Sequence, residues 1–448
     1  MGVEPMRRRL SRVCAASLAT CVSLWTIQAP SEASAAIEGR GTDPVVALLL
    51  ASDSTDPTGL DRDLAALGPG AIPRLFAVLE HGRLLAEWIE GGDESVPLLP
   101  GHSTAVLRAL ALQPHDELIA HLEGVAAEGA SRRRDETAML VLGAAGTEHD
   151  YRLLVRLAQP GVDEGAVPMS TRDAFEEALD DILRRRPASV GALHASYREC
   201  PTALLAPMVR AIGRQDTAAA ISVLSGMLGP DDDLDPVIFN EIARLGARIP
   251  HPIDDSVRRS VRFHLNGGDS PTVQAAIAAA GGIEDWEALP DLELLLGSED
   301  QNVRWGSAWA LRKITDRDLG LDPAAWATWR EAEMEWWVVE APQRFAELAS
   351  DDPVVASRAI LEIAQRRLYR HELATSLAAG LDRTEPGLLI MICTALGQLG
   401  SPVVLPGLVN LLEHDDPGVQ ASAWQALTGI TGENLPLESA SWRKAFEL

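Results

Sequence analysis

The sequence predicts an all-α fold, a right-handed α-solenoid of roughly ten stacked antiparallel helix pairs. Three observations lead to this prediction. Apolar residues make up 46% of the 448-residue chain and aromatic residues only 4%, and the apolar content is rich in Ala and Leu, which favour helices. Apolar positions recur at fixed distances from four glycines, and one long segment is repeated at a constant offset.

The repeat is marked by Gly143, Gly213, Gly281 and Gly397. Apolar residues stand four positions and one position before each glycine, a spacing that places both on one face of a first helix. The positions eleven and fourteen after each glycine share a face of a second helix, and they are occupied by Leu154, Leu157, Leu224, Met227, Leu292, Leu295, Leu408 and Leu411. We expect each glycine to end its first helix in a left-handed C-terminal cap.

A longer duplication supports the same unit. An offset of 116 residues (405 − 289) aligns two segments without a gap. It pairs Leu289 with Leu405, Pro290 with Pro406, Asp300 with Asp416, Val303 with Val419, Leu311 with Leu427, Thr315 with Thr431, and Trp326 with Trp442. Elsewhere the first helices start about 30 to 36 residues apart, which is the length of a two-helix solenoid unit.

The pattern within one unit is an apolar helix, a glycine, Leu-Pro-x-Leu-x-x-Leu-Leu, an acidic turn and Val-Arg-x-x-Ala-x-x-Ala-Leu. It is seen at Gly281, 289–296, 298–300 and 303–311. It resembles bacterial HEAT-like repeats, including the variety first associated with bilin lyases. The resemblance covers 270–315 and 385–431 most clearly and 135–230 more loosely. It implies an α-solenoid with a protein-binding role and no catalytic residues.

The N-terminus predicts export. Arg7, Arg8, Arg9 and Arg12 form a basic head, an apolar run covers 13–27, and Ala33-Ser34-Ala35 follows. This order is typical of a secretory signal peptide, with cleavage after Ala35 and a periplasmic or extracellular destination. A lipoprotein anchored at Cys21 is the less favoured alternative, because Thr20 is a poor residue before an acceptor cysteine.

Five parts follow along the chain. They are a signal peptide (1–35), a flexible linker (36–60), HEAT-like repeats whose N-terminal part is divergent or a cap (61–315), a Trp-rich insertion (316–341) and C-terminal HEAT-like repeats (342–448). No later stretch is long and apolar enough to predict a membrane span.

The net charge limits the classes of partner that the chain is expected to bind. A net charge of −26 repels phosphate, which argues against nucleic acid and anionic membranes and favours a basic protein partner over an acidic one. Cys200 and Cys393 lie far apart in the sequence, and repeats contact only their neighbours. We therefore expect both to be small buried hydrophobic residues and not a disulfide or a metal site.

No residue pattern predicts catalysis, a cofactor or a metal site. Asp316-x-Asp318-x-Gly320-x-Asp322 resembles a calcium loop, but its glycine comes one residue early and Ala327 stands where a bidentate Glu belongs. The favoured interpretation is a loop in which Asp322 caps the following helix.

Tryptophans gather between 305 and 337, and three of them are candidates for partner binding: Trp329, Trp336 and Trp337. One interpretation is that they pack the insertion onto the stack. The other is that they form an exposed patch, because aromatic residues are enriched in binding hot spots. Helical spacing places the first two on one face and Trp337 about 100° away.

These observations predict an exported protein-binding scaffold or adaptor that uses the concave surface of the solenoid and is not an enzyme. The alternative is a lyase-type enzyme, or an accessory subunit of one, by analogy with HEAT-like bilin lyases.

Overall fold

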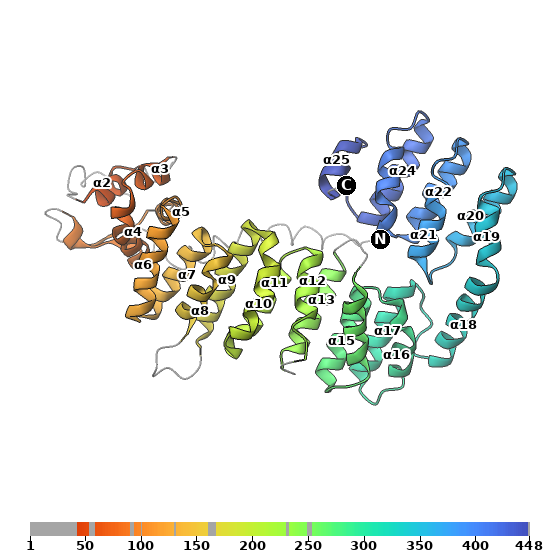
Figure 1. The fold of residues 1–448 in the computed structure, drawn as a ribbon, viewed down its shortest axis with the longest axis horizontal. Coiled ribbons are helices and arrows are strands. Elements are labelled where there is room, and N and C mark those ends of the chain that lie inside the picture. The colour runs from red at the N-terminus through yellow and green to blue at the C-terminus, as the bar shows by residue number, and fades with distance from the viewer. Residues whose placement is uncertain are drawn as a thin grey trace, which may run out of the picture. The chain divides into compact units, whose positions relative to one another are not determined.

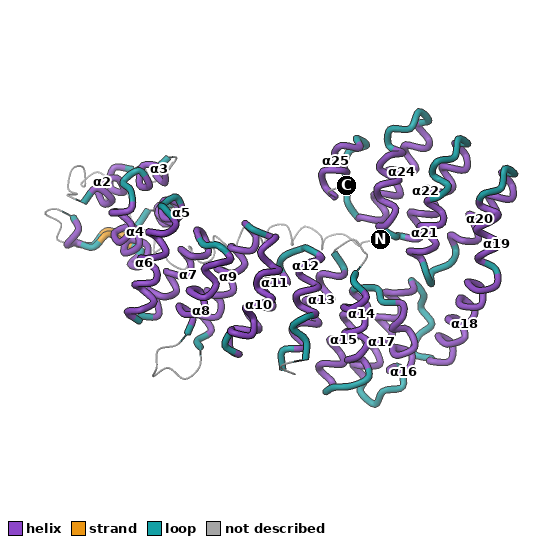
Figure 2. Tube along the Cα trace, viewed as in Figure 1, coloured by secondary structure: helices purple, strands orange, loops and turns teal. Residues whose placement is uncertain are grey.

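The computed structural model describes residues 43–52, 59–89, 94–99, 101–129, 131–159, 167–229, 233–248 and 253–446, and it is helical almost throughout (Figures 1 and 2). The predicted signal peptide lies outside these residues. The chain forms two compact units, residues 1–215 and 216–448. Both consist of consecutive helices, which confirms the predicted all-α solenoid.

The first unit stacks α5, α7, α9 and α11 as a row of first helices, with α6 and α8 in a second row. A short antiparallel pair, β1 (Arg83–Leu84) with β2 (Val96–Pro97), follows α4 (Figure 2). The helices are α2 (Pro44–Ala51), α3 (Leu60–Ala65), α4 (Ile72–His81), α5 (His102–Ala111), α6 (His115–Glu128), α7 (Arg132–Ala145), α8 (Tyr151–Ala158), α9 (Met169–Arg185), α10 (Val190–Ser196) and α11 (Thr202–Gly213).

In the second unit, α13, α15 and α17 form one row of first helices, and α20, α22 and α24 form another. Its helices are α12 (Ala218–Ser225), α13 (Asp235–Gly246), α14 (Asp255–Leu265), α15 (Ser270–Gly282), α16 (Leu289–Leu295), α17 (Gln301–Thr315), α18 (Pro323–Val339), α19 (Ala341–Leu348), α20 (Pro353–Ala364), α21 (Arg370–Ala378), α22 (Pro386–Leu399), α23 (Leu405–Leu411), α24 (Pro417–Thr431) and α25 (Ser439–Phe446). Within the described ranges, none of the helices combines the length and apolar character that a membrane crossing requires.

The acidic turns act as helix caps. The carboxylates of Asp269, Asp300, Asp352 and Asp416 each accept a backbone N–H from the first turn of α15, α17, α20 or α24. An N-cap of this kind satisfies a donor that the helix itself leaves unpaired. Proline follows the cap in three of these helices, where its missing N–H costs nothing.

The predicted repeat positions form the core. The eight residues before the anchor glycines are buried, as are seven of the eight positions after them, with Leu295 half-buried. Cys200 and Cys393 are free and buried, as expected. The apolar periodicity in the sequence therefore predicts correctly which helix faces are buried against neighbouring helices.

The predicted left-handed cap is wrong for all four anchor glycines, although Gly213 does end its helix, α11. Gly143, Gly281 and Gly397 lie inside their helices, and none has a left-handed backbone. A Cβ added at Gly143 would lie 2.9 Å from the Cα of Ala178 in the next first helix, and one at Gly397 would lie 3.1 Å from the Cα of Ala426. These glycines allow neighbouring first helices to approach closely.

The expected linker over 36–60 is wrong for residues 44–51, which form α2. Asp43 caps this helix by accepting N–H groups from Val45 and Val46. Val45, Val46 and Leu49 are buried. A short apolar run with an acidic cap is enough to form a packed helix.

The duplication extends to individual hydrogen bonds. The indole N–H of Trp326 donates to the carbonyl of Gly320 at 3.0 Å, and that of Trp442 donates to the carbonyl of Pro436 at 2.8 Å. Both indoles are fully buried. At the start of each segment a threonine, Thr315 or Thr431, accepts the backbone N–H two residues later at 3.2 Å. Residues 315–326 and 431–442 are therefore two copies of one structure, which we call the Trp tails.

Candidate functional site

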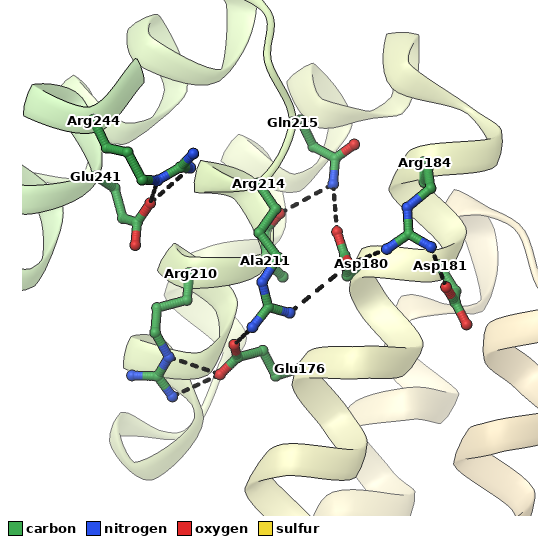
Figure 3. Close-up of polar contacts among 10 residues, drawn as sticks. All are labelled: Glu176, Asp180, Asp181, Arg184, Arg210, Ala211, Arg214, Gln215, Glu241 and Arg244. Atoms are coloured by element: carbon green, nitrogen blue, oxygen red, sulfur yellow. Dashed lines mark hydrogen bonds and ion pairs between the residues drawn. The ribbon is translucent and has the colours of Figure 1, made fainter. Parts of the chain in front are cut away.

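In the first unit, the exposed edge between α9 and α11 is a ladder of ion pairs (Figure 3). Glu176 of α9 accepts from Arg210 of α11 at 2.7 Å and from Arg214, the residue that follows α11. One turn later, Asp180 accepts from Gln215 at 2.8 Å and pairs with Arg184. Both carboxylates are about 5% exposed, while the arginines reach solvent.

The ladder joins two repeats and leaves little unpaired charge. Each buried carboxylate has at least two charged or hydrogen-bonding partners, as a buried charge requires. Figure 3 shows the guanidinium group of Arg210 directed at Glu176 and that of Arg214 lying between Glu176 and Asp180. This edge is therefore a structural contact between repeats and a weak candidate for recognition.

In the second unit, α17 carries two exposed tryptophans, Trp305 and Trp309, which are 53% and 44% exposed. They are one helical turn apart and therefore share a face. The ring of Trp309 lies against α15, because a Cβ added at Gly281 would come within 2.6 Å of it. One side of this indole is thus fixed by packing and the other is open to solvent. We call these two residues the Trp pair.

The duplication shows that the Trp pair is not needed to build the repeat. The offset of 116 places Ala421 and Gln425 where α17 has the two tryptophans. Both positions on α24 are also exposed. The Asp300 and Asp416 caps and the Trp tails recur in the two copies. The helix therefore also forms with Ala and Gln at these two sites, although α24 carries a half-buried tryptophan of its own, Trp424, where α17 has Ala308.

The three predicted tryptophans do not form one exposed patch. Trp336 is 4% exposed, its indole N–H donates to Glu362 at 3.0 Å, and Arg366 stacks on its ring at 4.5 Å. Trp337 is half-buried and its ring lies 4.6 Å from that of Tyr369. Trp329 is half-buried against Trp326, with ring centroids 6.1 Å apart.

Packing therefore accounts for Trp336, and no partner contact of Trp329 or Trp337 is established. The signal for the Trp pair was present in the sequence, since Trp305 and Trp309 stand at i and i+4. The sequence alone does not show which face of α17 the neighbouring helices leave exposed.

The loop that resembles a calcium site has the expected capping role. Asp322 accepts the backbone N–H of Ala324 at the start of α18. Asp318 accepts the N–H of Gly320, and Asp316 pairs with Arg367 at 3.3 Å. Across the described residues, no group of acidic, histidine or cysteine side chains is arranged to hold a metal ion.

The repeat geometry agrees with a sequence comparison. A sequence model of the family described as HEAT repeats matches residues 341–428, which span α19 to α24. Residues 341–428 are HEAT repeats. The second copy of the duplication lies largely in this HEAT segment, and the first copy repeats its caps, core and Trp tail.

Comparison with solved structures finds similar helical arrangements at low identity. An engineered protein is 18% identical with a TM-score of 0.31, covering 87% of this chain and 98% of its own. The CpcE–CpcF complex of phycocyanin lyase from Nostoc is 16% identical with a TM-score of 0.29, covering 63% and 94%. The karyopherin Kap121p, bound to the C-terminus of the phosphatase Cdc14p, is 12% identical with a TM-score of 0.38, covering 98% and 49%. The comparison with curated proteins gave no match.

Proposed function

We propose that this chain is an exported, non-enzymatic scaffold that binds a partner protein through its HEAT-like solenoid. The Trp pair on α17 is the proposed anchor. A rigid indole with one open face is typical of an interface hot spot, because it buries a large apolar area at little cost in side-chain entropy. The proposed binding surface is the exposed face of α17 that carries the Trp pair, and not the concave groove that the sequence led us to expect.

The observation that carries the proposal is the difference between the two copies. Large exposed apolar side chains are unfavourable for solubility, and α24 shows that the same helix exists without them. A binding role explains why α17 has Trp at both exposed positions. The net charge of −26 supports a basic partner.

Affinity capture from an envelope extract tests this proposal. The baits are the wild-type chain, the variant Trp305→Ala/Trp309→Gln, which introduces the residues of α24, and the control Phe263→Ala. Phe263 of α14 is 78% exposed and lies outside the Trp pair. We expect one or a few stoichiometric proteins on the wild type and control and their loss from the double variant. Equal capture by all three baits, or no capture by any, would contradict the proposal.

Export is part of the proposal and has a separate test. The chain is expressed from Met1 in a bacterial host, and the envelope and cytoplasmic fractions are analysed by intact mass. We expect an envelope species beginning at Ala36. An uncleaved cytoplasmic product would refute export and leave the binding proposal unaffected, because the Trp pair lies elsewhere.

A further inference from the structure

Three residues outside glycine have a left-handed backbone in the described parts of the chain: Glu284 (φ 52°), Asp316 (φ 55°) and Tyr369 (φ 60°). This conformation is unfavourable for a residue with a side chain, above all for a bulky one. It persists where the surrounding structure imposes it, and such residues gather at functional sites. All three lie in the second unit.

Each of these residues contacts the turn between α20 and α21 or belongs to it. Glu284, just after α15, pairs with Arg370, the first residue of α21 after that turn, and with Lys313 at 3.4 Å. Asp316, just after α17, pairs with Arg367 at 3.3 Å. The contacts with Arg367 and Arg370 link residues that are 51 or more positions apart in the sequence (367 − 316).

Tyr369 completes the contact with its ring. The ring lies edge-on to Trp286, with centroids 4.7 Å apart, and 4.6 Å from Trp337 of α18. Trp286 follows Glu284 in the α15–α16 loop, so the same loop supplies both an ion pair and an aromatic contact.

The α15–α16 loop, which contacts this turn, also contains a buried charged residue. Asp285 is fully buried, with Arg258 and Arg262 of α14 at 3.6 and 3.5 Å. Burial and the nearby Arg258 lower the pKa of Arg370 to about 10. A cation placed beside other cations in a buried site depends on its carboxylate, here Glu284.

Between residue 316 and this turn the chain forms α18, α19 and α20, and α18 and α19 follow each other almost without a gap. α18 ends at Val339, α19 begins at Ala341, and Pro342 interrupts the backbone hydrogen bonding at the junction. Arg330 ties the middle of α18 to Glu293 of α16 at 2.8 Å, and Glu333 ties it to Arg366 at 3.2 Å. α18 therefore bridges the repeats on either side.

We propose that residues 366–370 are a conformational latch. When closed, the latch holds the C-terminal HEAT repeats against the loops at 284–286 and 316. When open, it lets those repeats move about α18 and exposes Trp286 and Tyr369. Glu284 and Tyr369 are the backbone distortions that the closed contacts maintain, whereas Asp316 is the left-handed C-cap of α17, a position that Gly432 occupies in α24. This device is independent of the proposed partner binding.

Pulsed electron–electron double resonance, which measures the distance between two spin labels, tests the latch on the full chain. Spin labels are placed at Phe263→Cys on α14 and Ala421→Cys on α24, both exposed, with Cys14 and Cys21 replaced by serine. We expect one narrow distance distribution for the closed latch. The variant Trp286→Ala/Arg370→Gln should broaden it or add a second maximum.

Two further variants separate opening from unfolding. Arg344→Gln removes an ion pair with Glu362, 2.8 Å long, inside the C-terminal repeats, and should leave the distribution narrow. Tyr369→Gly removes the aromatic contact, but glycine adopts the left-handed backbone freely. It should broaden the distribution without lowering the melting temperature. An unchanged narrow distribution in folded Tyr369→Gly and Trp286→Ala/Arg370→Gln would overturn the latch.

Discussion

At the scale of single residues, the anchor glycines show how a correct pattern can be assigned the wrong role. A left-handed cap and a close helix crossing both exclude a side chain, so a recurrent glycine is compatible with either. The sequence placed Gly143 near the end of α7, and only the contact with Ala178 of α9 distinguishes the two.

The crossing role gives a stability prediction. Gly143→Ala should destabilise the chain by about 1 to 3 kcal/mol, because α7 and α9 must separate to admit the new methyl group. Gly124→Ala is the matched control, since Gly124 lies in α6 with open space around it. There the change should stabilise by about 0.5 to 1 kcal/mol through helix propensity. Urea denaturation measures both, and equal effects would refute the crossing role.

His371 gives a pH prediction. Burial, together with Arg370 and Arg258, lowers its pKa from 6.5 to about 4. The folded state therefore favours the neutral imidazole, so its stabilising contribution is complete above pH 6.5 and is lost as the pH falls toward 4. Between pH 7 and pH 5, the wild type should lose about 1 to 2 kcal/mol that His371→Gln does not lose. Parallel losses in urea denaturation would contradict this.

At the scale of elements, the helix pairs and their duplication were predictable because each first helix repeats the same buried positions. The Trp tails were predicted only in part. The offset aligned Trp326 with Trp442, but the shared hydrogen bond to a carbonyl six residues earlier appeared only in the structure. The Trp pair is exposed and Trp336 is buried because different helices pack over them. Helical spacing alone does not specify which helices these are.

The Trp tails make a prediction about stability. Trp442→Phe and Trp326→Phe each remove an indole N–H and leave a carbonyl without its donor, so each should cost about 1 to 3 kcal/mol. Trp305→Phe is the exposed control and should change stability by less than about 0.5 kcal/mol. Thermal denaturation of the three variants decides this. A tail variant as stable as the control would show that the hydrogen bond contributes nothing.

At the scale of the whole molecule, the solenoid was predictable and the latch was not. Local periodicity specifies contacts between successive repeats, whereas Glu284 and Arg370 lie 86 positions apart (370 − 284) and follow no period. Composition predicts an acidic surface, since the formal net charge is −26. The basic partner that we propose should bind more weakly as salt screens the charges.

The central claim is that the Trp pair anchors a protein partner, and the most direct test is an affinity measurement. The dissociation constant of a captured partner is measured by calorimetry for the wild type and for Trp305→Ala/Trp309→Gln. Loss of two hot-spot indoles should weaken binding by at least about 30-fold, corresponding to about 2 kcal/mol, while the melting temperature stays the same. Equal affinity for the two proteins would contradict the claim and move the binding surface away from α17.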